Sequence, residues 1–201
     1  MIDLKRLVKD IRQASYETLA KMVRDRVLKF DGEIAEVGVS VGNTAEIICK
    51  EKGSRPLHLF DTFTGHPEGW ITKYDWGQSI GRHEVNMEAV KERLKDYPNV
   101  HFYQGIFPTD TAHNVKDKKF CFVHLDTDLY KSTYEALEFF VDKIVPGGVI
   151  AFDDTSGIPS VFMAIEDFCV NNKDLVEKLL VPQPEGIILM AYINKAIINF
   201  K

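Results

Sequence analysis

Residues 120–130, Phe120-Cys121-Phe122-Val123-His124-Leu125-Asp126-Thr127-Asp128-Leu129-Tyr130, join an apolar run to a short acidic run. The same order recurs at residues 149–155, Val149-Ile150-Ala151-Phe152-Asp153-Asp154-Thr155. Short apolar runs of this kind are typical of strands in an open parallel sheet. Ligands bind outside the carboxyl ends of such strands, so two neighbouring strands bring these carboxylates to one edge. The pattern predicts an α/β sheet with an aspartate-rich functional edge.

Strand and helix patterns alternate through most of the chain. Further strands are predicted at 33–39, 57–60 and 100–103, and helical spacing of apolar residues at 4–27, 84–95, 132–144 and 161–168. Ser132 and Glu135 form a predicted capping box, and Pro146-Gly147-Gly148 is expected to end that helix. Two late apolar runs, 179–181 and 187–192, predict a C-terminal antiparallel hairpin. The fold class is therefore a doubly wound, mostly parallel α/β sheet in a single domain, 1–201, with a helical N-terminal cap, 1–30.

Composition narrows the class of protein further. The chain has 201 residues, of which 45% are apolar and 27% charged, as in ordinary globular domains. A formal net charge of −5 argues against a nucleic-acid partner. Three widely spaced cysteines, Cys49, Cys121 and Cys169, indicate reduced core residues. No signal peptide or long apolar run is apparent, so we expect a cytoplasmic protein without a membrane partner.

The turn after the first strand and the two following strand ends suggest a nucleoside site. Glu36 and Gly38 lie where the first strand turns into a helix, without the dinucleotide glycine pattern; a tight turn alone is the alternative for Gly38. An acidic residue at the end of the second strand can accept hydrogen bonds from ribose, although a turn or cap role is the alternative. The candidates for binding S-adenosylmethionine are Glu36, Gly38, Asp61, Thr62, Gly105 and Ile106.

The two acidic runs predict a metal centre. Asp126, Asp153 and Asp154 are expected to hold one divalent cation, and an all-carboxylate set favours Mg²⁺ over Zn²⁺. The cation would lower the pKa of a substrate hydroxyl, and Asp128 would accept its proton as general base. The alternatives are that Asp126 is both ligand and base, that the metal suffices alone, or that the acids cap helices.

Residues 63–83 have no clear periodicity and are rich in glycine and aromatic residues. Loops of this length in a compact domain are usually functional, so the segment is a candidate lid that excludes water. The alternative is a satellite hydrophobic cluster under a long loop. His66 and His83 flank this segment and are alternative general bases, whereas His124, inside the strand before Asp126, is expected to be packed or to support the site.

Several of these stretches together resemble the macrocin O-methyltransferase (TylF-like) family. They are Glu36-Val37-Gly38-Val39, Phe60-Asp61-Thr62-Phe63, residues 125–133, Pro146-Gly147-Gly148 and Phe152-Asp153-Asp154. The resemblance implies a class I methyltransferase fold with S-adenosylmethionine and magnesium. It also implies metal ligands at Asp126, Asp153 and Asp154 and a base at Asp128. This chain is shorter than the antibiotic-pathway members, and Gly65-His66-Pro67-Glu68-Gly69 matches their Phe-Glu-Gly-x-Pro pattern only in part.

The sequence thus predicts a magnesium-dependent O-methyltransferase that acts on a hydroxyl of a sugar or small polyol, from a natural product or a surface glycan. The substrate is a small molecule or a glycan precursor, and members of the family often form dimers, which suggests a homodimer. A catechol-type O-methyltransferase is one alternative, although its metal set usually reads Asp, Asp, Asn. A non-catalytic nucleoside-binding protein is the other.

Overall fold

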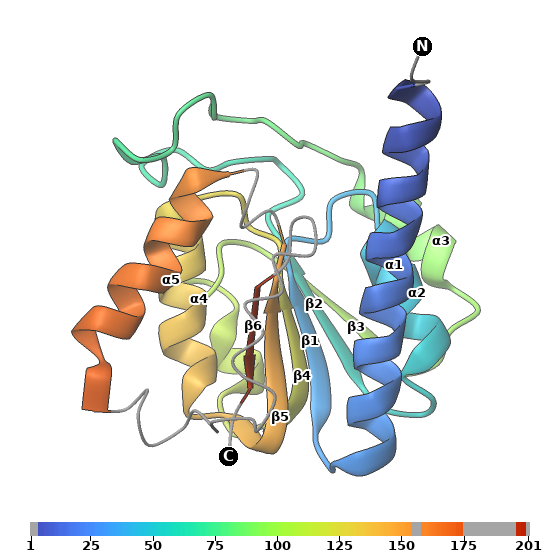
Figure 1. Ribbon diagram of the computed structural model, residues 1–201. Helices are drawn as coiled ribbons and strands as arrows, with labels where there is room; N and C mark the ends of the chain where they lie inside the picture. Colours follow the sequence, from blue (N-terminus) through green and yellow to red (C-terminus); the bar gives the residue numbers. More distant parts are fainter. Residues whose placement is uncertain (1–3, 154–157, 175–195, 200–201) are drawn as a thin grey trace.

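The computed structural model describes residues 4–153, 158–174 and 196–199. Its centre is one sheet in the order β3-β2-β1-β4-β5-β6, in which the first five strands are parallel and β6 is antiparallel to β5 (Figure 1). The strands are β1 (Glu33–Val37), β2 (Leu57–Asp61), β3 (Val100–Gln104), β4 (Phe120–Leu125), β5 (Ile144–Phe152) and β6 (Ala196–Asn199). All six residues of β4 are buried, as expected for a central strand covered on both faces.

Helices cover both faces of the sheet (Figure 1). One face carries α1 (Leu4–Lys29), α2 (Asn43–Glu51) and α3 (Met87–Leu94), and the other carries α4 (Tyr130–Val141) and α5 (Pro159–Asn171). A short 3₁₀ helix, η1 (Ala112–Val115), precedes β4. Alternate residues of β1 divide between the two cores, Ile34 on the α1–α2 side and Ala35 and Val37 on the other. The doubly wound α/β fold predicted from the alternating patterns is confirmed.

The strand order reverses between β1 and β4, and this reversal locates the ligand edge. From β1 the chain proceeds outward to β2 and β3, whereas β4 and β5 lie on the other side of β1. Val37 pairs with both Phe60 and Leu125, and Leu125 pairs with Phe152, so the carboxyl ends of four strands are aligned. An open α/β sheet binds its ligands at such a reversal point.

The prediction that Pro146-Gly147-Gly148 ends a helix is wrong. Helix α4 ends at Val141, and these three residues lie within β5, at a shift of its register against β4. Gly147 has a φ of 80°, and a Cβ there would lie 2.2 Å from the ring of Phe30. Arg26 also donates a hydrogen bond to the Gly147 carbonyl, at 2.8 Å. The glycine therefore allows the end of α1 to pack on β5.

Three further predictions concern the C-terminal hairpin, the cysteines and membrane-spanning segments. The two runs of the expected C-terminal hairpin lie outside the described residues, while β6 supplies an antiparallel edge strand. Cys49 and Cys121 are buried free thiols, and burial raises the pKa of Cys49 to about 12. Among the described helices, none combines the length and the hydropathy that crossing a bilayer would require.

Candidate active site

A cavity of about 270 Å³ opens at the carboxyl edge of the sheet, where the strand order reverses. Its walls come from the ends of β1, β2, β3 and β4 and from the segment between β2 and α3. Most of the residues expected at the cofactor and the reacting hydroxyl line it, namely Gly38, Asp61, Thr62, Gly105, Ile106, Asp126 and Asp128. The structure therefore brings together residues that are up to 90 positions apart in the sequence.

Gly38 is required by the close approach of two strand ends. Its φ is 87°, and a Cβ would lie 1.9 Å from the carbonyl oxygen of Asp126. Backbone hydrogen bonds hold this junction: Gly38 donates to the Phe60 carbonyl and Asp126 donates to the Val37 carbonyl, each at 2.9 Å. The tight-turn interpretation therefore explains the glycine without a ligand, and its contact with a cofactor stays a prediction.

Asp61 organises the turn that follows β1. Its Oδ2 accepts hydrogen bonds from the backbone N–H of Val39 and Ser40, at 2.7 and 2.9 Å, and its Oδ1 accepts one from Phe63 at 2.7 Å. A carboxylate has about four acceptor positions, so capacity remains on Oδ1 for a further donor. The turn role left open by the sequence is thus present, and a hydrogen bond to ribose stays a prediction.

Of the remaining cofactor candidates, Thr62, Gly105 and Ile106 line the cavity wall, whereas Glu36 is buried behind it. The Thr62 hydroxyl donates to the Gly65 carbonyl at 2.7 Å, and the Ile106 N–H donates to Asp110 Oδ2 at 2.9 Å, which fixes the wall beside Gly105. Glu36, in contrast, is fully buried and does not line the cavity. Its Oε1 lies 2.9 Å from Nδ1 of His124, which is also fully buried, as expected for a supporting residue. Direct cofactor contact by Glu36 stays a prediction.

Two of the three predicted metal ligands follow paired positions at the ends of β4 and β5. Leu125 pairs with Phe152, and the Asp153 N–H donates to the Leu125 carbonyl at 2.9 Å. Asp126 and Asp153, which come next on each strand, are both partly buried, and Asp126 lines the cavity. Carboxylates at adjacent strand ends suit a hard divalent cation. Asp154 lies outside the described residues, so the full ligand set stays a prediction.

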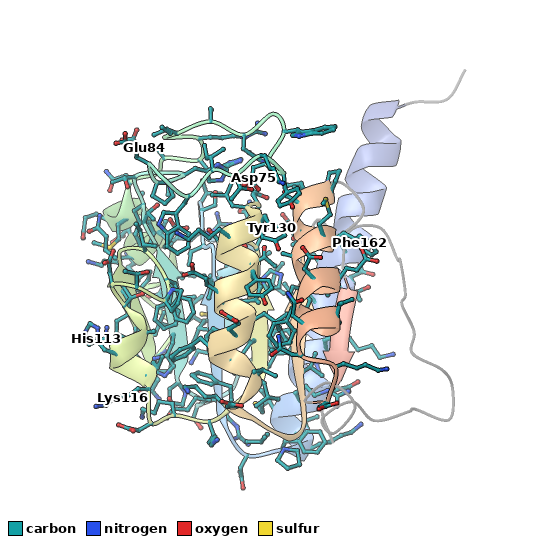
Figure 2. All side chains as sticks on the ribbon, turned by 90° about the vertical axis from the view of Figure 1, so that its left-hand side faces the viewer. Asp75, Glu84, His113, Lys116, Tyr130 and Phe162 are labelled. Atoms are coloured by element: carbon teal, nitrogen blue, oxygen red, sulfur yellow. The ribbon has the colours of Figure 1, made fainter. Side chains whose placement is uncertain are left out.

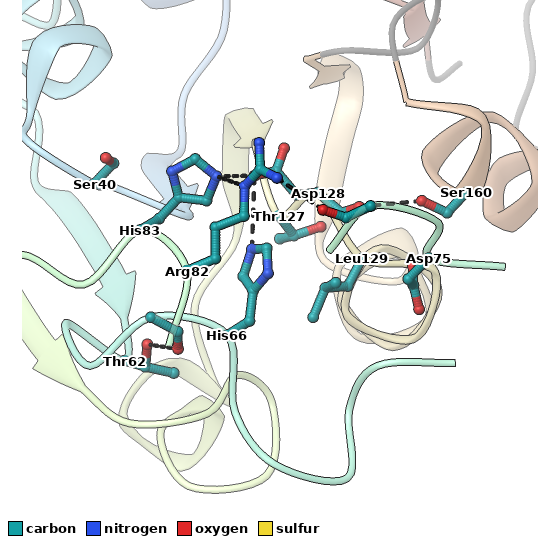
Figure 3. A network of polar contacts seen from close by, with 12 residues as sticks. Ser40, Thr62, His66, Asp75, Arg82, His83, Thr127, Asp128, Leu129 and Ser160 are labelled. Carbon is teal, nitrogen blue, oxygen red and sulfur yellow. Dashed lines mark hydrogen bonds and ion pairs between the residues drawn. The ribbon is translucent and has the colours of Figure 1, made fainter. Parts of the chain in front are cut away.

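Asp128 lies between the strand ends and the long loop. Its φ of 59° places it in the left-handed region, which aspartate tolerates better than most residues. Ser160, in the first turn of α5, donates to the Asp128 carbonyl at 3.1 Å. On the cavity side, Asp128 Oδ2 lies 3.3 Å from His83 Nε2 and 3.7 Å from His66 Nε2 (Figure 3). One carboxylate oxygen of Asp128 therefore lies beside both histidine rings.

The segment between β2 and α3 is closed at its base by backbone pairing. Thr64 and Glu84 form an antiparallel bridge, the His66 N–H donates to the Arg82 carbonyl, and the Gly81 N–H donates to the His66 carbonyl, each of these two bonds at 2.9 Å. A Cβ on Gly65 would lie 2.3 Å from the Gly81 carbonyl oxygen, so the pairing requires glycine there. The two ends of the loop thus present His66 and His83 side by side.

The loop also caps helix α4. Asp75 Oδ1 accepts a hydrogen bond from the Tyr130 N–H at 2.7 Å, and its Oδ2 accepts from the N–H and the hydroxyl of Thr72, at 2.6 and 2.7 Å (Figure 2). The capping box predicted at Ser132 and Glu135 is therefore wrong, since the helix begins at Tyr130. The cap comes instead from a residue 55 positions earlier in the chain. A carboxylate at a helix N-terminus also interacts favourably with the helix dipole.

Aromatic residues fix part of this loop and leave part exposed. Trp70 is buried, with the Lys131 ammonium 4.3 Å from its ring centre, and Tyr74 packs on Tyr130 with ring centres 4.7 Å apart. Trp76, in contrast, is 88% exposed, and Ile80 is exposed as well. Burial and a hydrogen bond to Asp167 raise the pKa of Tyr130 to about 12, so its hydroxyl is not a base at neutral pH. The lid role of the segment stays a prediction.

With this geometry described, the chain can be compared with known proteins. The family model for macrocin O-methyltransferase (TylF) matches residues 1–180. The chain belongs to the TylF family. The O-methyltransferase family that the motifs at Gly38, Asp61, Asp126 and Asp153 resembled is thereby confirmed.

Two curated relatives of the chain come from Streptomyces species. One, from Streptomyces olivaceus, is 8-demethyl-8-(2,3-dimethoxy-alpha-L-rhamnosyl)-tetracenomycin-C 4'-O-methyltransferase; it is 30% identical over 169 residues, 77% of this chain. The other, demethyldecarbamoylnovobiocin O-methyltransferase from Streptomyces niveus, is 24% identical over 93% of this chain and 73% of its own length. This TylF-family chain spans 61% of the length of the first relative.

Solved structures support the fold. The O-methyltransferase NovP superposes with a TM-score of 0.74 at 20% identity, over 93% of this chain and 79% of that one. CalS11, the calicheamicin methyltransferase, superposes with a TM-score of 0.70 at 20% identity, over 96% of this chain and 79% of that one. The TylF-family chain therefore has the Rossmann-like methyltransferase fold.

Seven of the site residues predicted from the sequence line the cavity, and their roles stay predictions, whereas the contacts of the loop with Asp128 and α4 were not predicted. The sequence offers no signal for Asp75 or Arg82, and it presents His66 and His83 only as alternative bases. Their proximity to Asp128 depends on backbone pairing across 17 positions of irregular chain, which leaves no periodic signal. The one available clue was the pair of histidines at the two ends of the glycine-rich segment.

Proposed function

We propose that this chain is an S-adenosylmethionine-dependent O-methyltransferase that methylates a hydroxyl group of a sugar, on a natural product or a surface glycan. The observation that carries the proposal is one cavity, at the strand-order reversal, lined by Gly38, Asp61, Asp126 and Asp128. Membership of the TylF family supports the reaction type. The names of its relatives support the acceptor class, since one is the 4'-O-methyltransferase of a rhamnosyl-tetracenomycin and CalS11 is a TDP-rhamnose 3'-O-methyltransferase.

The β1–β2–β3 half of the cavity fits the cofactor. Gly38 has no side chain to project between the ends of β1 and β4, so space remains there for a ligand. Asp61 can still accept a hydrogen bond from a ribose hydroxyl, and Thr62 lies next to it in the cavity wall. Gly105 and Ile106 form the wall after β3, where the adenine ring would lie. None of these residues presents a phosphate-binding glycine loop, which suits a nucleoside without phosphates.

The β4–β5 half of the cavity fits a cation and the acceptor. Asp126 and Asp153, together with Asp154, would hold Mg²⁺, which when bound lowers the pKa of a coordinated hydroxyl and orients it. The acceptor oxygen then forms a bond to the methyl carbon while the carbon–sulfur bond breaks. Asp128 accepts the hydroxyl proton, and His66 and His83 lie beside its carboxylate at the cavity wall.

The test is methyl transfer from isotopically labelled S-adenosylmethionine to a panel of deoxysugar nucleotides, rhamnosides and catechols, read by mass spectrometry. We expect Mg²⁺-dependent methylation of a sugar hydroxyl. Asp153→Asn and Asp128→Asn should each lower the rate by about 100-fold or more, because removing a ligand or a base costs a large part of the rate enhancement. The exposed Asp117→Asn, matched in chemistry, should have no effect.

Cofactor binding is measured separately by calorimetry, where both site variants should bind S-adenosylmethionine nearly as the original chain does. If only the catechols were methylated, the acceptor would be an aromatic diol and not a sugar. Binding of S-adenosylmethionine without transfer to any member of the panel, or full activity of Asp153→Asn, would overturn the proposal.

A further inference from the structure

Three side chains that converge at the cavity mouth are not needed to hold either S-adenosylmethionine or Mg²⁺. His66, His83 and Asp128 each offer a ligand atom within 4.8 Å of the other two, and Asp128 Oδ2 lies 3.3 Å from His83 Nε2 and 3.7 Å from His66 Nε2 (Figure 3). Around a four-coordinate zinc ion, with bonds of about 2.0–2.1 Å, neighbouring ligand atoms are roughly 3.4 Å apart. The two separations from Asp128 Oδ2, 3.3 and 3.7 Å, are close to that value.

The hydrogen bonds of these groups leave lone pairs facing one another. His83 Nε2 accepts a hydrogen bond from Arg82 Nε at 3.0 Å, so this nitrogen carries no proton for Asp128. His66 is only 8% exposed, its Nδ1 has no hydrogen-bond partner among the described residues, and its Nε2 reaches Asp128 only at 3.7 Å, beyond hydrogen-bond range. The Nε2 of this buried ring makes no hydrogen bond among the described residues and can offer its lone pair to a cation, while the unpartnered Nδ1 on the other side of the ring would stay unpaired.

The backbone holds the three donors in place before any cation binds. His66 and His83 lie on the paired ends of the loop, where Gly65 allows the two backbone segments to approach. Asp128 is held in its left-handed conformation between β4 and α4, with its carbonyl bonded to Ser160. Preorganisation of this kind is what a metal site needs, because little ordering remains to be done when the ion binds.

We propose that His66, His83 and Asp128 form a second cation site, specific for an imidazole-preferring divalent transition metal such as Zn²⁺ and separate from the aspartate edge. Two imidazoles and one carboxylate suit Zn²⁺, Fe²⁺ or Co²⁺ and disfavour Mg²⁺. Three protein ligands leave coordination positions open toward the cavity, which all three residues line. Only Oδ2 of Asp128 is used, so Oδ1 remains for the acceptor proton. The site does not depend on the proposed reaction.

Arg82 makes the proposal unusually testable. Its guanidinium donates to the lone pair that would bind the metal, and a second nitrogen donates to the Gly77 carbonyl at 2.8 Å. The charge and the hydrogen bond both oppose a cation at His83. Removing the guanidinium should therefore raise metal affinity, whereas removing an imidazole should lower it. A purely structural role for the two histidines predicts no such pair of opposite effects.

The experiment is a titration of the full chain with Co²⁺ in excess Mg²⁺, followed by visible absorption, which reports imidazole coordination. We expect one-to-one binding that falls more than 10-fold in His83→Asn and in His66→Asn, because even changes outside the ligand shell cost about 10–100-fold in affinity. Arg82→Gln should bind Co²⁺ more tightly. The exposed His113→Asn, labelled in Figure 2, is the matched control and should bind like the original chain.

The test of the second site remains possible even if one of the histidine variants unfolds. His66 is buried and its variant can unfold, but the His83 side chain is 45% exposed, so His83→Asn carries the test, with circular dichroism to verify its fold. The second site would be overturned if His83→Asn bound Co²⁺ as tightly as the original chain does, or if Arg82→Gln bound it more weakly. Asp153→Asn separates the two proposals: it should abolish the Mg²⁺ effect on methyl transfer and keep the Co²⁺ spectrum.

Discussion

The two halves of the cavity are built in different ways. The sheet-edge half consists of strand ends joined by backbone hydrogen bonds, as at Gly38 and Asp126, where neighbours in the sheet fix the geometry. The loop half is formed by the segment between β2 and α3, which side chains hold in place, with Asp75 on the N-terminus of α4 and Trp70 beside Lys131. A sheet edge tolerates little change, whereas loop contacts of this kind can be altered one at a time. The loop half is therefore the part of the cavity that can change without disturbing the sheet.

The largest effect should come from the strand ends. Gly38→Ala places a methyl group against the Asp126 carbonyl oxygen at a positive φ, and we expect a loss of roughly 3 kcal/mol or more in unfolding free energy. Chemical denaturation measures it. Gly53→Ala is the control, since Gly53 also has a positive φ, 59°, but has open space around its Cβ position. Equal losses in the two variants would show that the strand ends can separate.

The next effect concerns the contact between loop and helix. Asp75→Ala removes the acceptor from the Tyr130 N–H and from Thr72, and we expect a loss of about 2 kcal/mol in unfolding free energy. The loop should also become open to limited proteolysis between residues 64 and 84, and the Tyr130 amide should exchange faster with solvent. Asp117→Ala, on the exposed surface, should change neither. Unchanged proteolysis in Asp75→Ala would mean that the aromatic contacts alone hold the loop.

The same contrast explains what the sequence could predict. Apolar runs ending in aspartate at residues 126 and 153 located two adjacent strands and their edge, because buried parallel strands leave a strong local signal. Glycine and proline at 146–148 were mistaken for a helix stop, since a bulge in β5 under Phe30 depends on packing by a distant helix. The Asp75 cap was missed for a similar reason. Local patterns cannot reveal a helix cap that comes from another segment of the chain.

The smallest effect tests the aromatic part of the loop. The Lys131 ammonium lies 4.3 Å from the Trp70 ring centre, and its side chain remains partly exposed. A double-mutant cycle with Lys131→Gln and Trp70→Leu should therefore give a coupling energy of about 0.5 kcal/mol. Denaturation of the four proteins measures it, with the exposed Lys116→Gln in place of Lys131→Gln as the uncoupled control. A coupling of zero would mean that Trp70 is held by burial alone, and that Asp75 is the main link between the loop and the helix beside Asp128.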